Sequence, residues 1–129
     1  MIYQYVKYVT REISRTIECD EVCTELATVE GVTYVHVPDD YELPVQPAEV
    51  AESLQPVTLT PELRDAIKAA SPHVWLINAR VREKIADVYP LHEEIKLLRT
   101  APSAEFDAYN EYAEECREWG RVQKALLGL

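Results

Sequence analysis

The stretch TPELRDAIKAASPHVWLINARVREKIADV, residues 60–88, contains two helix-start signals in succession. Thr60-Pro61-Glu62 combines an N-cap residue, a proline at the first helical position and an early acidic residue. Each of these favours the N-terminus of a helix. Ser71-Pro72 repeats the signal, so we expect one helix to end near Ala70 and a second to begin there. The stretch therefore predicts that the second half of the chain is helical.

The second of these helices carries an apolar stripe at three- and four-residue steps, which is typical of a helix with one buried face. Pro90 interrupts the stripe near Tyr89, and a further apolar series restarts it as far as Arg99. We expect this further series to form a short helix that packs against the last helix of the chain. The first series is Val74, Ile77, Val81, Ile85 and Val88, and the second is Leu91, Ile95 and Leu98.

The last helix has apolar residues on two adjoining faces. Ala101-Pro102-Ser103 predicts a turn, and Ser103 is placed to cap a helix that reaches Leu127. One face is a heptad seam and the other is a second apolar line, so we expect two neighbours. One is the short helix before it, and the other is either a second chain or the helix at residues 74–88. The interface candidates on this helix are Phe106, Tyr109, Tyr112, Ala113, Trp119, Gly120, Leu126 and Leu127.

The first 37 residues are rich in strand formers. Residues 2–9 are dense in Tyr and Val, and residues 13–19 alternate apolar with polar side chains, so both predict strands. Residues 22–29 carry apolar side chains at helical spacing, and residues 32–37 predict a further strand. In this interpretation Asp20 is the N-cap of the helix and Gly31 ends it.

A proline-rich, acidic stretch follows. Four prolines between residues 38 and 56 disfavour regular structure, apart from a helical turn near residues 48–54. We expect this connector to lie over the helices, with Leu43, Val45 and Leu54 as anchors. The predicted fold is α+β: a β-containing unit at 1–37, a connector at 38–57 and a helical region with a long last helix at 58–129.

Composition narrows the function classes. The net charge of −10 disfavours nucleic-acid binding, because a phosphate backbone repels acidic surfaces. No apolar run is long enough to span a membrane, and residues 1–8 have no secretory signal pattern. Three cysteines then indicate reduced thiols in a cytoplasm. Three glycines exclude a glycine-rich phosphate loop, and we expect no cofactor.

Cys19, Cys23 and His36 have a spacing close to part of a zinc-finger pattern, but the fourth ligand is missing. We therefore expect no metal site and no catalytic cluster, and we interpret Cys116 as a small core residue. His73 and His92 lie near helix starts without partners that mark a site. The paired acids Asp39/Asp40, Glu93/Glu94 and Glu114/Glu115 are more typical of solvated surfaces than of acid–base catalysis.

The tyrosine-rich start leaves two interpretations open. Tyr3, Tyr5 and Tyr8 are typical of a recognition surface, because tyrosine is enriched at interfaces. They are equally typical of a strand packed on helices. Tyr3 and Tyr5 are therefore interface candidates as well.

Two segments carry a family resemblance. The first is Gly31 to Pro38 with Leu43-Pro44-Val45-Gln46-Pro47 after it. The second runs from Ser71-Pro72-His73-Val74 to Arg121. They resemble small tail-region proteins of tailed bacteriophages and prophages, and the acidic helical ending with a Trp is similar in character to tail-fibre assembly proteins. The resemblance implies a non-enzymatic, oligomeric tail component or fibre-assembly protein, in the virion or the host bacterial cytoplasm, with protein partners.

A second hypothesis belongs to a different class. The charge of −10 also fits an acidic, phage-encoded inhibitor that mimics nucleic acid. Against it, lysines and arginines are mixed among the acids between Arg64 and Lys124 and interrupt any continuous negative stripe. A small enzyme has no positive support in the sequence.

Overall fold

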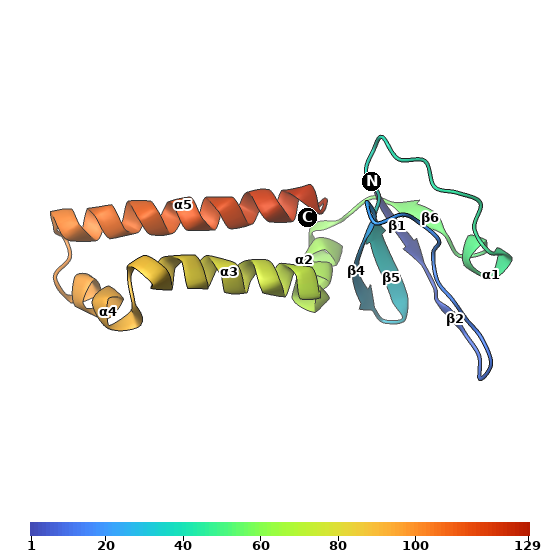
Figure 1. Ribbon diagram of the computed structural model, residues 1–129, viewed down its shortest axis with the longest axis horizontal. Coiled ribbons are helices and arrows are strands. Elements are labelled where there is room, and N and C mark those ends of the chain that lie inside the picture. Colours follow the sequence, from blue (N-terminus) through green and yellow to red (C-terminus); the bar gives the residue numbers. More distant parts are fainter. The chain divides into compact units, whose positions relative to one another are not determined.

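Strands fill the first part of the chain and helices the second, so the protein is α+β (Figure 1). The computed structural model describes all residues from 1 to 129. By packing, the chain forms two units. The sheet unit comprises Met1–Val74 with Leu127–Leu129, and the helical unit comprises Trp75–Leu126. The predicted boundary at residue 58 follows the change of secondary structure, whereas packing assigns the first helix after it to the sheet unit.

The sheet unit contains a four-stranded antiparallel sheet. Its order is β4 (Thr24–Val29), β5 (Val32–His36), β1 (Ile2–Tyr5) and β6 (Gln55–Val57). A separate ribbon joins β2 (Tyr8–Val9) to β3 (Ser14–Arg15). The predicted strand at 32–37 is confirmed, whereas the predicted strands at 2–9 and 13–19 are broken and shortened.

The helix predicted at residues 22–29 is wrong, because these residues form β4. Glu30 and Gly31 both have positive φ, 50° and 81°, and link the paired residues Val29 and Val32. Two consecutive positive φ values form the tight turn of a β-hairpin. This turn favours glycine, just as the C-terminal end of a helix does. Asp20 therefore precedes a strand, and its backbone carbonyl accepts a bond from the amide of Cys23 at 3.1 Å.

Both faces of the sheet are covered by the unit's own chain, with α2 and α1 on opposite sides (Figure 1). On one face Ile67 of α2 (Pro61–Ala70) packs with Ile2, Leu26 and Tyr34. On the other face, Val50 of α1 (Ala48–Ala51) packs with Tyr5, Val35 and Val37. Alternate residues of β5 thus enter two different cores.

The connector departs from the prediction in two ways. Residues 55–57 form an edge strand, β6, and Pro56 is tolerated there because an edge strand need not donate on its outer side. Leu43 and Leu54 do anchor the segment, but on the sheet core around Val50 rather than on the helices. Val45 is 95% exposed and anchors nothing. The predicted helical turn is present as α1.

The helix starts are confirmed by their caps. The side-chain oxygens of Thr60, Ser71 and Ser103 accept bonds from Leu63, Val74 and Phe106 amides at 3.2, 3.4 and 3.1 Å. They begin α2, α3 (Pro72–Val88) and α5 (Ala104–Leu126), and α4 (Leu91–Arg99) lies between the last two. In the helical unit, α3 and α5 run side by side in opposite directions (Figure 1).

Candidate protein-interaction surface

Most interface candidates on α5 are covered by helices of the same chain. Tyr109, Ala113 and Gly120 are buried. A Cβ atom added to Gly120 would lie 2.7 Å from Val81 Cγ2, so α3 approaches α5 closely at this point. Within the chain, α3 covers these residues at the small seam positions, as the competing intramolecular account expects.

Aromatic side chains complete this core. The rings of Tyr89 and Tyr109 meet edge to face with centroids 5.0 Å apart, and Tyr112 and Phe106 adjoin them. The Tyr112 hydroxyl donates to the backbone oxygen of Lys84 at 3.0 Å. Phe106 and Tyr112 are half-buried in this cluster, so they too serve the intramolecular packing of α3 and α5.

The end of α5 is more open. Trp119 is half-buried, and the Lys84 ammonium lies 4.5 Å from its ring centroid, a cation–π contact. Leu126 is exposed. Leu127 has left the helix and packs in the sheet-unit core with Ile67. Of the α5 candidates, Leu126 alone is exposed, whereas Trp119, like Phe106 and Tyr112, is half-buried.

The tyrosines of β1 belong to the sheet core. Tyr5 is 1% exposed, and Tyr3 packs against the same cluster. Burial raises the pKa of Tyr5. The interpretation as a packed strand is therefore correct for Tyr3 and Tyr5, whereas Tyr8 in β2 is exposed.

Cys23 and His36 lie on opposite faces of the sheet. Cys23 packs with Val35 and Val37, while His36, between them in the sequence, lies on the other side, near Gly128. No three His, Cys, Asp or Glu side chains are close enough to hold a metal ion. Burial raises the pKa of the Cys23 thiol to about 11, so the thiol is protonated at neutral pH. Cys116 is buried in the helical core, as predicted.

The paired acids take structural partners or face solvent. Glu94 accepts a hydrogen bond from the Tyr109 hydroxyl at 2.6 Å, which ties α4 to α5. Glu114 pairs with Arg117 and Arg121, and Glu118 also pairs with Arg121. Asp39 meets the Met1 amino group at 3.1 Å. His92 lies 3.5 Å from Glu93 on the surface of α4.

One apolar line remains uncovered on the helical unit. Leu91, Ile95 and Leu98 follow one another along α4 and are 72%, 43% and 61% exposed. We call this line the α4 stripe. The sequence shows the spacing of these three residues, but it does not show whether they face the core or the solvent. Leu97 and Glu94 make the inward contacts of α4, which turns the stripe outward.

A groove of about 410 Å³ adjoins the α4 stripe within the helical unit. Its apolar lining comes from α3 and α5 and includes Ile85 and Tyr109, and Leu91 belongs to both the groove and the stripe. Arg82 and Arg117 add positive charge to it. The complete lining is Val81, Arg82, Ile85, Ala86, Leu91, Glu94, Tyr109 and Arg117.

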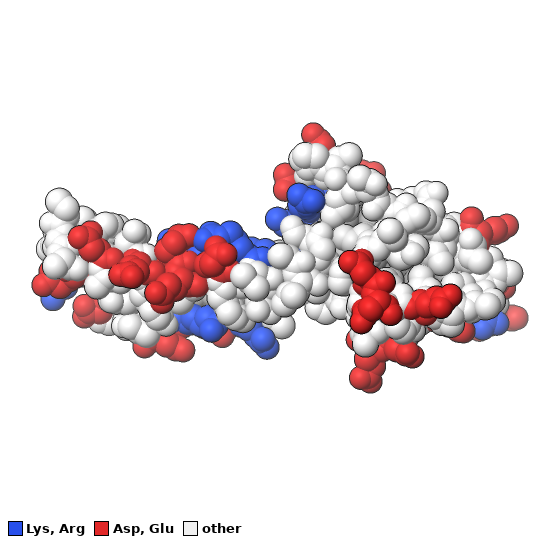
Figure 2. Space-filling model, turned by 90° about the horizontal axis from the view of Figure 1, so that it is seen from above, with Lys and Arg blue, Asp and Glu red and all other residues white.

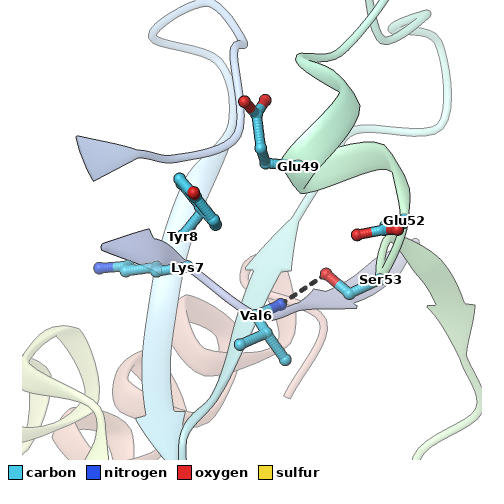
Figure 3. Close-up of a pocket in the computed structure, with 6 residues that line it drawn as sticks. All are labelled: Val6, Lys7, Tyr8, Glu49, Glu52 and Ser53. Carbon is cyan, nitrogen blue, oxygen red and sulfur yellow. Dashed lines mark hydrogen bonds between the residues drawn. The ribbon is translucent and has the colours of Figure 1, made fainter. Parts of the chain in front are cut away.

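A second pocket, of about 340 Å³, lies in the sheet unit between the start of β2 and α1 (Figure 3). Val6, Tyr8, Glu49 and Glu52 surround it, and the Val6 amide donates to Ser53 Oγ at 2.9 Å. Lys7 points away from the two glutamates and pairs with Glu25 at 2.6 Å.

Comparisons with protein-family models, with curated proteins and with solved structures gave no match. Among the helices, none combines the length and apolar character needed to cross a membrane.

Proposed function

We propose that this protein is a non-enzymatic protein-interaction module. Its helical unit would receive a helix of a partner protein on the α4 stripe and in the adjoining groove. The observation that carries the proposal is the exposure of Leu91, Ile95 and Leu98 along one line beside an apolar groove. Their spacing of four and three residues is the spacing at which one helix packs along another.

The chemistry of the partner follows from the groove. Covering a fully exposed Leu or Ile contributes about 1.5–3 kcal/mol, so the partially exposed stripe would contribute several kcal/mol in all. The Glu94 carboxylate is already bonded to Tyr109, whereas Arg82 makes no ion pair. An amphipathic helix with an apolar face and acidic residues beside it therefore fits best.

A narrower proposal comes from the sequence resemblance. In this proposal the partner is a tail or fibre protein of a bacteriophage, met in the virion or the host bacterial cytoplasm. The alternative of a nucleic-acid mimic has less support, because basic and acidic side chains adjoin along the helical unit (Figure 2). Arg121, for example, lies 2.7 Å from Glu118.

The test compares two double variants. Leu91→Glu with Leu98→Glu changes the α4 stripe. Val122→Glu with Leu126→Glu is the matched control, since both residues are exposed apolar positions on α5. Each chain is used to capture partners from cells that produce the protein, and captured proteins are then titrated in purified form.

We expect at least one partner whose Kd rises about 100-fold or more with the stripe variant and changes little with the control, since burying a charge without a partner is costly. Circular dichroism checks that both variants fold. Partners that bind the stripe variant as tightly as the unaltered chain would disprove the proposal.

A further inference from the structure

The β2–β3 ribbon projects from the sheet unit as an arm, residues 6–15 (Figure 1). It pairs only with itself and not with the four-stranded sheet. At its tip the Thr10 amide donates to the Ile13 carbonyl at 2.8 Å, and the Thr10 hydroxyl oxygen accepts from the Ile13 amide at 3.1 Å. The turn is thus well defined by its own hydrogen bonds.

The arm exposes apolar side chains that it cannot cover by itself. Val9 is 68% exposed, and Val6, Tyr8 and Ile13 are exposed as well. An isolated two-stranded ribbon has no second layer to bury its side chains and is marginal in water. A binding surface on another molecule would provide that layer.

Charge is segregated between the arm and the rest of the chain. The arm carries Lys7, Arg11 and Arg15 against one acid, Glu12, for a net charge of +2. The remaining residues, with 10 basic and 22 acidic side chains, carry −12. No lysine or arginine occurs from residue 16 to residue 63, a stretch with 11 acids. The positive arm is therefore opposite in charge to the rest of its own chain, and the two are electrostatically complementary.

The pocket at the base of the arm has the matching chemistry. Its carboxylates, Glu49 and Glu52, make no hydrogen bond or ion pair, and neither do the guanidinium groups of Arg11 and Arg15. Val6 and Tyr8 add an apolar wall to the pocket (Figure 3). Unpaired acids thus lie at one end of the arm and unpaired arginines lie further along it.

We propose that two copies of this chain form a two-fold dimer in which each arm docks in the arm-base pocket of the other copy. Arg11 and Arg15 of one copy meet Glu49 and Glu52 of the other, and Val9 and Ile13 cover Val6 and Tyr8. Because the pocket lies at the base of the arm in each copy, antiparallel contact of two arms places each arm against the other copy's pocket. This dimer surface is independent of the α4 stripe.

The decisive experiment uses two charge-reversed chains. The arm variant is Arg11→Glu with Arg15→Glu, and the pocket variant is Glu49→Arg with Glu52→Arg. Each variant alone presents like charges at the contact and should dimerise more weakly than the unaltered chain. A 1:1 mixture restores opposite charges at both contacts, so it should form a heterodimer. Masses are measured by sedimentation across concentration, with circular dichroism as the check on folding.

We expect the unaltered chain to rise from 14.8 kDa towards about twice that mass as concentration increases. We expect each variant to weaken dimerisation at least about tenfold, the scale of close interfacial charge pairs. Arg64→Glu with Arg80→Glu matches the arm variant in net charge and should dimerise like the unaltered chain. The α4 stripe variant should also dimerise like the unaltered chain. The dimer and the proposed function are therefore tested separately.

Three outcomes would overturn the dimer. They are an unaltered chain that stays at 14.8 kDa at all concentrations, a reversed variant that dimerises alone as the unaltered chain does, and a mixture that stays monomeric. Added salt should weaken the unaltered dimer, because exposed charge pairs are screened.

Discussion

The four-stranded sheet and the helical unit differ in how completely their apolar surfaces are covered. The four-stranded sheet lies between two layers of its own chain, with Ile67 on one face and Val50 on the other. The helical unit packs α3, α4 and α5 around one core and leaves the α4 stripe outside. Complete cover serves stability, whereas incomplete cover leaves surface that a partner can use.

The largest expected effect comes from breaking the sheet core. Leu26 is 0% exposed, so Leu26→Ala should lower the free energy of unfolding by about 2–5 kcal/mol. Leu91→Ala is the matched change on the α4 stripe and should alter it by no more than about 0.5 kcal/mol. Urea unfolding measures both. If both substitutions lowered the free energy of unfolding equally, the sheet core and the α4 stripe would not differ in their contribution to stability.

A second prediction concerns the contact between α3 and α5. Gly120→Ala should destabilise the helical unit by about 1 kcal/mol or more, because the new Cβ atom would lie 2.7 Å from Val81 Cγ2. In a Val81→Ala background the clash is gone, and the helix propensity of alanine favours the same change by up to about 1 kcal/mol.

Tryptophan fluorescence during unfolding measures this pair, because both tryptophans, Trp75 and Trp119, belong to the helical unit. An effect of the same sign and size in both backgrounds would show that Val81 does not limit the approach of the two helices.

The third prediction concerns the bond that holds α4 against α5. Tyr109→Phe removes the hydrogen bond to Glu94 and should cost about 1–2 kcal/mol. This bond raises the pKa of Tyr109 above 10.0, so the folded state favours the neutral phenol. Its contribution is complete below pH 10 and is lost as the pH rises through the raised pKa.

The unaltered chain should therefore lose helical-unit stability in alkali more steeply than Tyr109→Phe, as fluorescence-monitored unfolding from about pH 8 to about pH 11 would show. Parallel pH profiles for the two chains would contradict this account of α4.

The smallest expected effect is in the sheet unit. Burial, followed by the Met1 amino group, lowers the pKa of His36 below 6.5. The folded state thus favours the neutral ring, and this contribution is present above pH 6.5 and is lost as the pH falls through the lowered pKa. Proton NMR of the ring should give a midpoint below 6.5. A midpoint above 6.5 would show that Asp39 dominates the site instead.

Local signals made the helices predictable. Thr60, Ser71 and Ser103 form their caps within three residues, so the sequence around each is sufficient. The strand at residues 24–29 was missed because Gly31 ends a helix and turns a hairpin with the same backbone conformation. A register shift between Glu25 and Ala27 also places Leu26 and Ala27 both inside, which removes the alternation that marks a strand.

In other parts of the chain, prediction from the sequence was limited because the structure depends on contacts between residues that are distant in the sequence. β6 forms only because β1 provides its partner, and nothing near Pro56 in the sequence shows that pairing. The interface candidates on α5 have the expected apolar character, and α3 of the same chain approaches them closely at Gly120. The direction of the α4 stripe depends on Glu94 and Tyr109, 15 residues apart. The charge of the arm was readable from Arg11 and Arg15, but its isolation from the sheet was not.

The chain leaves the sheet unit after Val74 and returns to it at Leu127. The helical unit is thus an insertion within the sequence of the sheet unit. Matched seven-residue additions to α3 and α5 would extend the hairpin by about two turns and preserve its seam. The distance along the helical unit from the first turn of α3 to the α4 stripe is therefore a quantity that evolution or design can adjust by whole repeats.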